Sequence, residues 1–243
     1  MRIPRLFQKQ TLSIHDYVEL DTATSHRLTT VLRLTVGAQL ILFNGDGYEY
    51  RSVIKTQKKH NLGVTILEKH PKNIESPLVI HLGQVISKGE KMDFVIQKAT
   101  ELGVHTITPL FSERSVIHLK SERLEKKFEH YQKIAIHAAE QCGRTTVPRI
   151  EKSLPCAEWI FSRQEAARLI LDPSATHTLS TLTLKSPIAL LIGPEGGLTD
   201  TEVTYALQHG FTALRLGPRI LRTETAALTA IAALQAKAGD LDL

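Results

Sequence analysis

The stretch Ile188-Ala-Leu-Leu-Ile-Gly-Pro-Glu-Gly-Gly-Leu-Thr-Asp200 runs from a short apolar segment through a Gly-Pro turn into residues typical of a helix start. The pattern recurs 24 positions later, in Leu214-Arg-Leu-Gly-Pro-Arg-Ile-Leu-Arg-Thr-Glu-Thr-Ala226. Apolar runs bounded by Gly and Pro predict buried strands, and the Thr-, Asp- and Glu-rich segments after them predict helix N-termini. Two such junctions place two loops at the carboxyl edge of a parallel sheet, where open α/β folds bind ligands. We therefore expect a ligand site there.

The rest of the second half of the chain alternates between strands and helices. Apolar runs at residues 78–86, 104–110 and 167–171 predict further strands. Helical spacing predicts helices over residues 91–102, which Gly103 ends, over 121–141, and over roughly 14 residues from Thr225. This alternation indicates an α/β fold with a parallel sheet.

Residues 1–73 have a different pattern, which predicts a small β domain. Residues 37–43 and 48–54 are expected to form a hairpin around Asn44-Gly-Asp-Gly47, because Asn-Gly and Asp-Gly supply the positive φ of tight turns. Residues 63–67 predict another strand, and residues 25–34 a short helix. Two prolines within residues 70–77 predict a linker, so we place the domain boundary between residues 73 and 74.

The charge of the chain is unevenly distributed. The net charge is +5, and residues 1–75 hold 11 Lys and Arg against 7 Asp and Glu, while the remaining 168 residues are nearly neutral. This distribution fits a polyanion-binding module beside a catalytic one, and it equally fits an ordinary solvated surface.

Two cysteines, Cys142 and Cys156, lack the spacing of a zinc site or a disulfide framework, so we expect no metal and a reducing compartment. The first residues lack the apolar segment of a signal peptide, and no apolar run approaches the roughly 20 residues of a membrane span. These observations predict a cytoplasmic protein with no membrane partner.

The first Gly-Pro loop does not match the known phosphate-binding motifs. It is neither GxGxxG nor a Walker loop, Pro194 removes an amide donor, and Glu195 would repel phosphate. The loops suit an apolar ligand that is neutral or cationic and is held by backbone groups, such as an adenosyl sulfonium. A structural turn without a ligand remains the alternative.

The second loop places charges in an apolar frame. Arg222 and Glu224 are flanked by Leu221 and Ala226, so we expect them to be partly buried and paired. One interpretation is structural, with an Arg222–Glu224 ion pair or with Thr223 or Thr225 capping the final helix. In the other interpretation, Arg222 faces the site and stabilises an anion.

Several segments together resemble the bacterial RsmE family, SPOUT-class methyltransferases that act on N3 of a uridine in 16S ribosomal RNA. The resemblance covers nearly the whole chain and excludes residues 155–164. It rests on Leu191-Ile-Gly-Pro-Glu-Gly-Gly-Leu198, Leu216-Gly-Pro-Arg-Ile-Leu-Arg-Thr-Glu-Thr-Ala-Ala227, Met1-Arg-Ile-Pro-Arg5, His26 with Val31-Leu-Arg33, His81-Leu-Gly-Gln-Val-Ile-Ser-Lys-Gly-Glu-Lys-Met92, Ile107-Thr-Pro-Leu-Phe-Ser-Glu-Arg114, Ile134-Ala135 and Glu140-Gln-Cys-Gly-Arg144.

The resemblance implies a PUA-like β-barrel domain over residues 1–73 and a SPOUT methyltransferase domain over residues 74–243. It also implies a trefoil knot, which chain-connectivity rules alone would disfavour, and a homodimer in which the base enters between subunits. The cofactor would be S-adenosylmethionine. Its predicted contacts are Leu171, Ile192, Gly193, Glu195, Gly196, Leu216, Gly217, Leu221 and Ala226.

Methylation at N3 requires removal of the imide proton, whose pKa is on the order of that of a Tyr or Lys side chain. Cationic donors near O2 and O4 would stabilise the resulting anion. We assign this to Arg222, with the partner subunit's Arg114 as a second donor. Glu224 would orient Arg222 or accept the proton, and Glu195 would shape the cofactor loop.

The RNA substrate predicts cationic contacts to phosphate groups. We assign these to Arg2, Arg5, Arg27 and Arg33, for which ordinary surface arginines are the alternative. The partner would be 16S ribosomal RNA within the assembled small subunit, with the target base extruded.

Two competing functions remain compatible with the sequence. One is an RNA-binding or assembly factor that keeps the fold without chemistry, although such a factor has no need of Glu195, Arg222 and Glu224. The other is a SPOUT enzyme that methylates a ribose 2′-OH.

Overall fold

The computed structural model describes residues 3–58, 61–87, 89–115 and 121–241. The chain divides into two compact units, which we describe separately. The N-terminal unit comprises Met1–Glu75 and Ala139–Thr146, and the C-terminal unit comprises Ser76–Ala138 and Val147–Leu243. The division thus falls two residues from the expected boundary. That residues 139–146 belong to the first unit was not expected.

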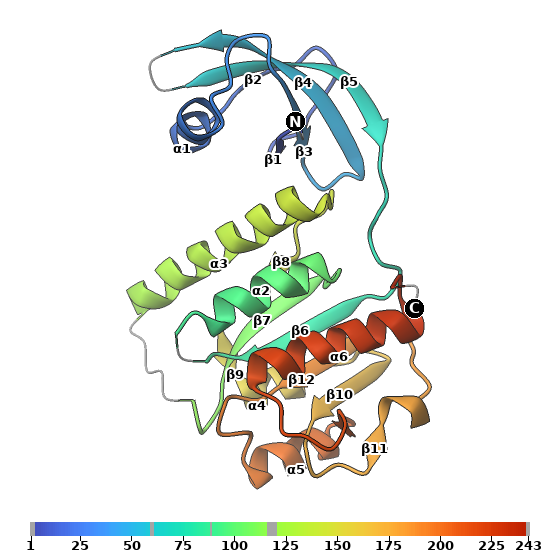
Figure 1. The fold of residues 1–243 in the computed structure, drawn as a ribbon. Helices are drawn as coiled ribbons and strands as arrows, with labels where there is room; N and C mark the ends of the chain where they lie inside the picture. The colour runs from blue at the N-terminus through green and yellow to red at the C-terminus, as the bar shows by residue number, and fades with distance from the viewer. Residues whose placement is uncertain (1–2, 59–60, 88, 116–120, 242–243) are drawn as a thin grey trace. The chain divides into compact units, whose positions relative to one another are not determined.

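The N-terminal unit is built on a curled five-stranded sheet, in the blue and cyan part of Figure 1. Its order is β1-β3-β4-β5-β2, and all its pairs are antiparallel except β1 with β3. The strands are β1 (Arg5–Phe7), β2 (Tyr17–Glu19), β3 (Gln39–Phe43), β4 (Tyr48–Gln57) and β5 (Leu62–Pro71). The expected hairpin is confirmed, and Gly45 and Gly47 adopt φ values of 96° and 83° in its turn.

Helical turns connect β2 to β3. Asp21 is the N-cap of helix α1 (Thr22–His26), and its carboxylate accepts a hydrogen bond from the Thr24 backbone N–H. A π-helical turn, η1 (Arg27–Val31), follows it directly. Leu28 of this turn is fully buried in the core formed with the strands. The short helix expected over residues 25–34 is therefore present as two consecutive turns.

Residues 139–146 dock onto the first strand through polar side chains. The Phe7 backbone N–H donates to the Glu140 carboxylate at 3.2 Å, and an Arg5 Nη donates to the Arg144 carbonyl at 2.8 Å. Arg144 is itself buried and donates to Glu75 at 2.8 Å. The Glu140–Arg144 segment that carried part of the resemblance thus has a structural role in this unit.

The C-terminal unit contains a parallel sheet with the order β11-β13-β10-β12-β6-β7-β8, with β9 also on β7. Its strands are β6 (Ile80–Val85), β7 (Thr106–Phe111), β8 (Arg149–Ile150), β9 (Leu154–Pro155), β10 (Ala167–Leu171), β11 (His177–Thr178), β12 (Ile188–Ile192) and β13 (Thr212–Arg215). Every pairing in it is parallel, as the alternation of strands and helices predicted.

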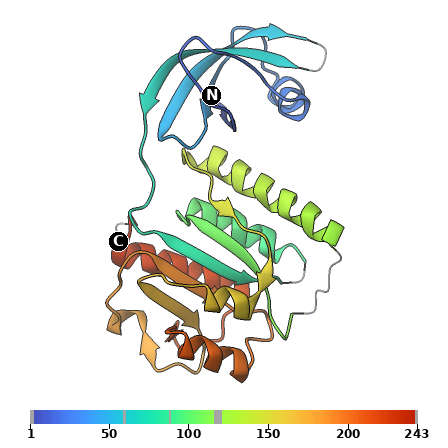
Figure 2. The ribbon, with the colours of Figure 1, turned by 180° about the vertical axis from the view of Figure 1, so that it is seen from behind.

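Helices cover both faces of this sheet (Figures 1 and 2). They are α2 (Lys91–Glu101), α3 (Ser121–Cys142), α4 (Cys156–Phe161), α5 (Asp200–Gln208) and α6 (Thr223–Ala238), with a short 3₁₀ turn, η2 (Leu179–Thr181). Central strand β12 supplies both cores. Ile188, Leu190 and Ile192 pack with α2 and α6, whereas Ala189 and Leu191 pack with α4 and α5. Such full burial explains its uninterrupted apolar sequence.

Both strand–loop–helix junctions of the C-terminal half are confirmed, since β12 leads to α5 and β13 leads to α6. Helix α6 begins at Thr223, two residues before the expected start. Strands β8, β9 and β11 and helix α4 were not anticipated. None of the described helices has both the length and the apolar character needed to cross a membrane. The trefoil knot stays a prediction.

Candidate functional site

The two Gly-Pro loops line one cavity at the carboxyl edge of the parallel sheet. We call residues 193–199 the first loop and residues 216–222 the second loop. Eight of the nine residues expected to hold the cofactor line this cavity, namely Leu171, Ile192, Gly193, Glu195, Leu216, Gly217, Leu221 and Ala226. Gly196 does not line it but lies between Glu195 and Gly197, which do. The sequence therefore located the cavity, and contact of these residues with a cofactor stays a prediction.

Glycines allow the two loops to turn tightly. A Cβ on Gly193 would lie 3.0 Å from the Leu198 side chain, so this position has little room for a larger residue. Gly217 has a φ of 70°, in the left-handed region that favours glycine. The first loop then passes into α5 through a capping box, in which Thr199 and Glu202 bond reciprocally.

Thr223 joins three elements around the cavity. Its hydroxyl donates to the Gly193 carbonyl at 2.6 Å and accepts a hydrogen bond from the fully buried Gln84 amide at 3.0 Å. The first loop, β6 and the start of α6 are thereby held together. The expectation that Thr223 or Thr225 caps α6 is wrong, because the N-cap is Arg222, which makes no side-chain capping bond.

Lys91, at the start of α2, lies between the two acidic residues of the site. Its Nζ is 2.9 Å from a Glu195 carboxylate oxygen and 3.9 Å from a Glu224 carboxylate oxygen. The ion partner of Glu224 in the structure is thus Lys91 and not Arg222. Lys91 was not among the expected site residues, although it lies in one of the segments that carried the resemblance.

Glu224 and Arg222 differ in burial. The Glu224 side chain is 16% exposed, and its buried Oε2 has no hydrogen-bond partner within the described part of the chain. Arg222 is exposed, so the expectation that its side chain is partly buried is wrong. At the start of α6, Thr223 and Ala227 are buried instead.

Arg114 contacts the first loop of its own chain. It lies in the turn that follows β7, and its Nη1 donates to the Gly196 carbonyl at 2.8 Å and to the Leu198 carbonyl at 3.4 Å. The carboxyl ends of β7 and β12 lie at the same edge of the parallel sheet, which brings these residues together. The structure therefore gives Arg114 a partner within the chain.

Comparison with known proteins gives a consistent result. The model of an RNA methyltransferase domain matches residues 74–235, and that of an RNA methyltransferase PUA domain matches residues 20–67. The ribosomal RNA small subunit methyltransferase E of Buchnera aphidicola (Schizaphis graminum) is 45% identical over 99% of this chain and 98% of its own. The chain belongs to the RsmE family.

Solved structures extend the similarity of this RsmE-family chain to its fold. A methyltransferase from Legionella pneumophila, in complex with SAM, is 42% identical with a TM-score of 0.96, over 99% of this chain and 100% of that one. An RsmE protein from Neisseria gonorrhoeae, bound to S-adenosylmethionine, is 37% identical with a TM-score of 0.91 over the same shares. The Bacillus subtilis member is 32% identical over 86% of each chain.

The arginines expected to contact RNA in this RsmE-family chain occupy different environments. Arg2 lies outside the described residues. Arg5 is 8% exposed and forms an ion pair with Glu49, as expected of a structural arginine. Arg27 pairs with Glu140 at 3.0 Å and keeps a third of its side chain exposed, and Arg33 is exposed. Geometry therefore favours Arg27 and Arg33 over Arg5 as phosphate contacts.

Among the described residues, no group of three or more His, Cys, Asp or Glu lies together in a way that could hold a metal ion. Burial, with a smaller effect of Glu202, raises the pKa of the Cys156 thiol to about 12. Cys156 is therefore a packing residue of α4 and not a nucleophile.

Proposed function

We propose that this RsmE-family protein transfers the methyl group of S-adenosylmethionine to N3 of a uridine in 16S ribosomal RNA of the small subunit. The observation that carries the proposal is the single cavity lined by both Gly-Pro loops. It lies in a chain whose relatives are small-subunit RNA methyltransferases, and two similar structures were solved with the cofactor.

The cavity suits S-adenosylmethionine in its lining and charge. Leu171, Ile192 and Leu216 offer apolar surface for the adenine ring, and the two loops offer backbone groups to its edges. Glu195 provides a carboxylate beside a ligand that carries positive charge on sulfur and on its amino group. When bound, the cofactor supplies a methyl group on the positively charged sulfur.

Glu224 is the best placed proton acceptor. Its buried Oε2 is without a hydrogen bond in the described structure, and the Lys91 ammonium lies 3.9 Å from it. Removal of the N3 proton leaves an imide anion, and N3 then forms its bond to carbon as the carbon–sulfur bond breaks. Arg222, exposed beside Glu224, would stabilise the charge on O2 and O4.

Arg114 and Lys91 fit a positioning role in this mechanism. Each side chain is bound to the first loop, through two carbonyls for Arg114 and through Glu195 for Lys91. A loop held on both sides reduces the entropy lost when the cofactor and the base are aligned.

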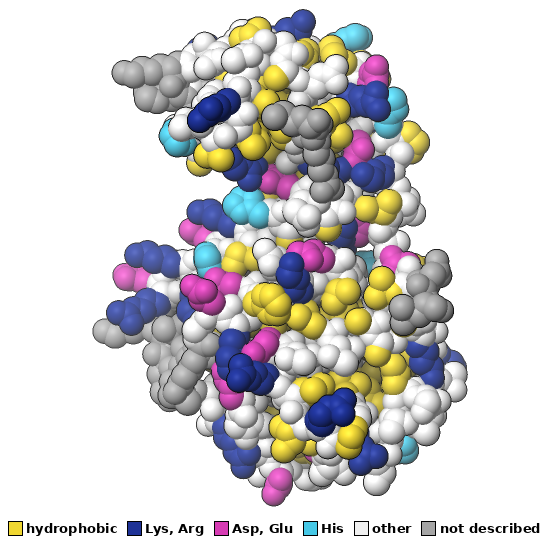
Figure 3. All heavy atoms as spheres, in the orientation of Figure 1, with side chains coloured by type: hydrophobic (Ala, Val, Ile, Leu, Met, Phe, Trp, Pro, Cys, Tyr) yellow, Lys and Arg dark blue, Asp and Glu magenta, His cyan; other side chains and the backbone are white. Residues whose placement is uncertain are grey.

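The exposed hydrophobic side chains of the C-terminal unit suggest a second copy of the chain as its partner. Figure 3 shows hydrophobic side chains gathered over the face that carries α2 and α6. Phe94 of α2 is 47% exposed, and Ile220 of the second loop is 86% exposed beside the cavity. Covering these side chains with a second subunit would enclose the site, so we propose a homodimer in which the base enters between subunits.

We propose that the basic N-terminal unit holds the RNA through Arg27 and Arg33, with the assembled small subunit in the cytoplasm as the substrate. The test measures transfer of tritiated methyl groups to small subunits that lack the modification, and in parallel to protein-free 16S RNA. We expect transfer to the subunits, and tight binding of S-adenosylmethionine by calorimetry. Absence of both would support the RNA-binding factor without chemistry.

A further inference from the structure

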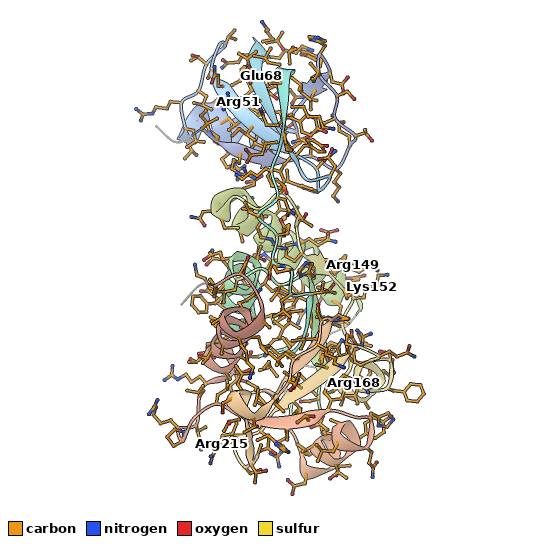
Figure 4. The ribbon with its side chains drawn as sticks, turned by 90° about the vertical axis from the view of Figure 1, so that its right-hand side faces the viewer. Arg51, Glu68, Arg149, Lys152, Arg168 and Arg215 are labelled. Atoms are coloured by element: carbon orange, nitrogen blue, oxygen red, sulfur yellow. The ribbon has the colours of Figure 1, made fainter. Side chains whose placement is uncertain are left out.

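A second groove lies at the β8–β9 edge of the C-terminal unit and shares no lining residue with the cavity between the Gly-Pro loops. We call it the edge groove. Its polar lining includes Arg149, Lys152, Arg163, the acidic Glu151, Gln132 and Ser153. Three of these side chains carry positive charge, and Figure 4 shows Arg149 and Lys152 side by side on this flank of the unit.

Arg163 is held in a fixed orientation within the groove. Its Nη1 donates to the Glu165 carboxylate at 3.0 Å, and its Nη2 donates to the Ser162 hydroxyl at 3.1 Å. The guanidinium also lies 5.1 Å from the ring centroid of the buried Trp159. An arginine whose planar group is already oriented loses little entropy when it binds an oxyanion.

His81 supports Arg163 as a neutral ring. Its Nδ1 can accept a hydrogen bond from Arg163, and its Nε2 lies 2.7 Å from the buried Thr108 hydroxyl and 3.4 Å from the Trp159 Nε1. Burial, and then the charge of Arg163, lowers the pKa of His81 to about 4. The ring is therefore uncharged at neutral pH, which is the form that this hydrogen bond requires.

Arg149 and Lys152 supply charge that can change partners. Arg149 is 76% exposed and is paired only with Glu151, at 2.8 Å, among the contacts that the structure describes. Exposed pairs of this kind contribute little to stability, so a phosphate can replace the carboxylate at little cost. Lys152 is exposed at the same rim.

We propose that the edge groove binds phosphate groups of the RNA backbone, in a segment of the substrate that flanks the target uridine. The inference rests on the proposed RNA substrate and adds a contact surface to it. Phosphate contacts supply most of the affinity of proteins for RNA and fix its register without reading sequence. Arg163 has a guanidinium group in a fixed orientation, and Arg149 and Lys152 carry charges that can change partners. Gln132 and Ser153 are neutral hydrogen-bond donors. Together these side chains match the chemistry of a phosphate backbone.

The test compares Arg149→Ala/Lys152→Ala with Lys126→Ala/Lys185→Ala, which removes two exposed lysines of the same unit that do not line the groove. All four side chains are exposed, so both variants should fold. Binding of a fluorescent fragment of 16S RNA is measured by anisotropy over a salt series. We expect the first variant to bind about five- to tenfold more weakly, with a salt slope reduced by about 1.5, and the control to bind like the wild type.

A charge-conserving variant, Arg149→Lys/Lys152→Arg, should restore most of the RNA affinity. In the methylation assay, Arg149→Ala/Lys152→Ala should have a higher KM for RNA, while its kcat and its affinity for the cofactor stay unchanged. Equal RNA binding by the first variant and the control would overturn the proposal. Because anisotropy needs no methyl transfer, a wild type that binds RNA without methylating it would contradict the proposed function and leave this test intact.

Discussion

At the level of single residues, the proposed chemistry rests on Glu224 and Arg222, two neighbours that differ sharply in environment. Glu224 is largely buried, with a carboxylate oxygen that has no hydrogen-bond partner in the described structure and lies 3.9 Å from Lys91, while Arg222 is exposed at the N-cap of α6. A buried carboxylate beside a lysine suits proton transfer, and an exposed arginine suits an incoming anionic base. These roles can be separated by substitution.

Glu224→Gln keeps the shape of the side chain but removes its capacity to accept a proton. We expect kcat to fall by about 10²- to 10⁴-fold, with cofactor affinity within about twofold of the wild type. Glu129→Gln, an exposed residue of α3, is the control and should leave both unchanged. Methyl-transfer kinetics and calorimetry measure the effect, and unchanged turnover in Glu224→Gln would remove it from the mechanism.

Arg222→Ala should lower kcat by about 10²- to 10³-fold, because it deletes a donor to the developing anion. Circular dichroism and thermal unfolding should match the wild type, since Arg222 is exposed and makes no capping bond. A variant that folds normally and keeps full turnover would eliminate the assignment of Arg222.

The lowered pKa of His81 predicts that the stability of the folded protein depends on pH. Its pKa is about 4 in the folded state against 6.5 unfolded, so below pH 6.5 the unfolded state binds more protons. The stabilisation is complete above pH 6.5 and is lost as the pH falls towards 4, by on the order of 2 kcal/mol. Urea unfolding between pH 4.5 and 7 should show this loss in the wild type and in His137→Gln, and less of it in His81→Gln.

The sequence alone could identify those residues whose role follows from a local pattern. The two loops were found because turns and buried strands have local signatures, and the contact residues that the resemblance implied line the cavity, except for Gly196. Lys91 was missed, because its partner Glu195 lies 104 positions away and no local pattern indicates the pair. The burial of Arg5 likewise depends on Glu49, a contact between separate strands.

At the level of elements, Lys91 links α2 to the first loop and to the start of α6. Lys91→Ala should weaken S-adenosylmethionine binding by about two- to fivefold, because an ion pair at a half-exposed position contributes up to about 1 kcal/mol. Lys98→Ala removes an ion pair from the same helix, with Glu101, and should have no effect. Lys91→Arg should recover the affinity. Equal cofactor binding by Lys91→Ala and Lys98→Ala would contradict the linking role.

The elements that sequence predicted are the long or strongly apolar ones. Strands β10 and β12 have the expected bounds, and α2 ends before Gly103 as expected. Strands β8, β9 and β11 contain two residues each, which is too short for any periodicity. They form because β7 and β13 each have an edge at which a neighbouring segment of the chain forms backbone hydrogen bonds.

At the level of the whole molecule, we predict a dimer of the 27.1 kDa chain through the α2–α6 face. Light scattering after size exclusion should give about twice the chain mass. Phe94→Glu places a charge among the exposed hydrophobic side chains of that face and should shift the protein to a monomer with reduced activity. Phe161→Glu is the control, since Phe161 is 71% exposed on α4, on the opposite face of the sheet. If Phe161→Glu were a monomer and Phe94→Glu stayed a dimer, the interface would not lie on the α2–α6 face.

The arrangement of the units goes beyond what local patterns predict. The two prolines of residues 70–77 predicted a boundary between residues 73 and 74, but residues 139–146 join the N-terminal unit through tertiary hydrogen bonds of Glu140 and Arg144. The predicted knot and the proposed dimer would likewise depend on chain threading and on a second subunit, which no periodicity encodes.

The most direct test of the account identifies the methylated nucleoside. Small subunits lacking the modification are incubated with the protein and S-adenosylmethionine that carries a deuterated methyl group. The 16S RNA is then digested and analysed by mass spectrometry. The account predicts one labelled N3-methyluridine per RNA. A labelled 2′-O-methyl nucleoside, or an unlabelled RNA, would contradict it.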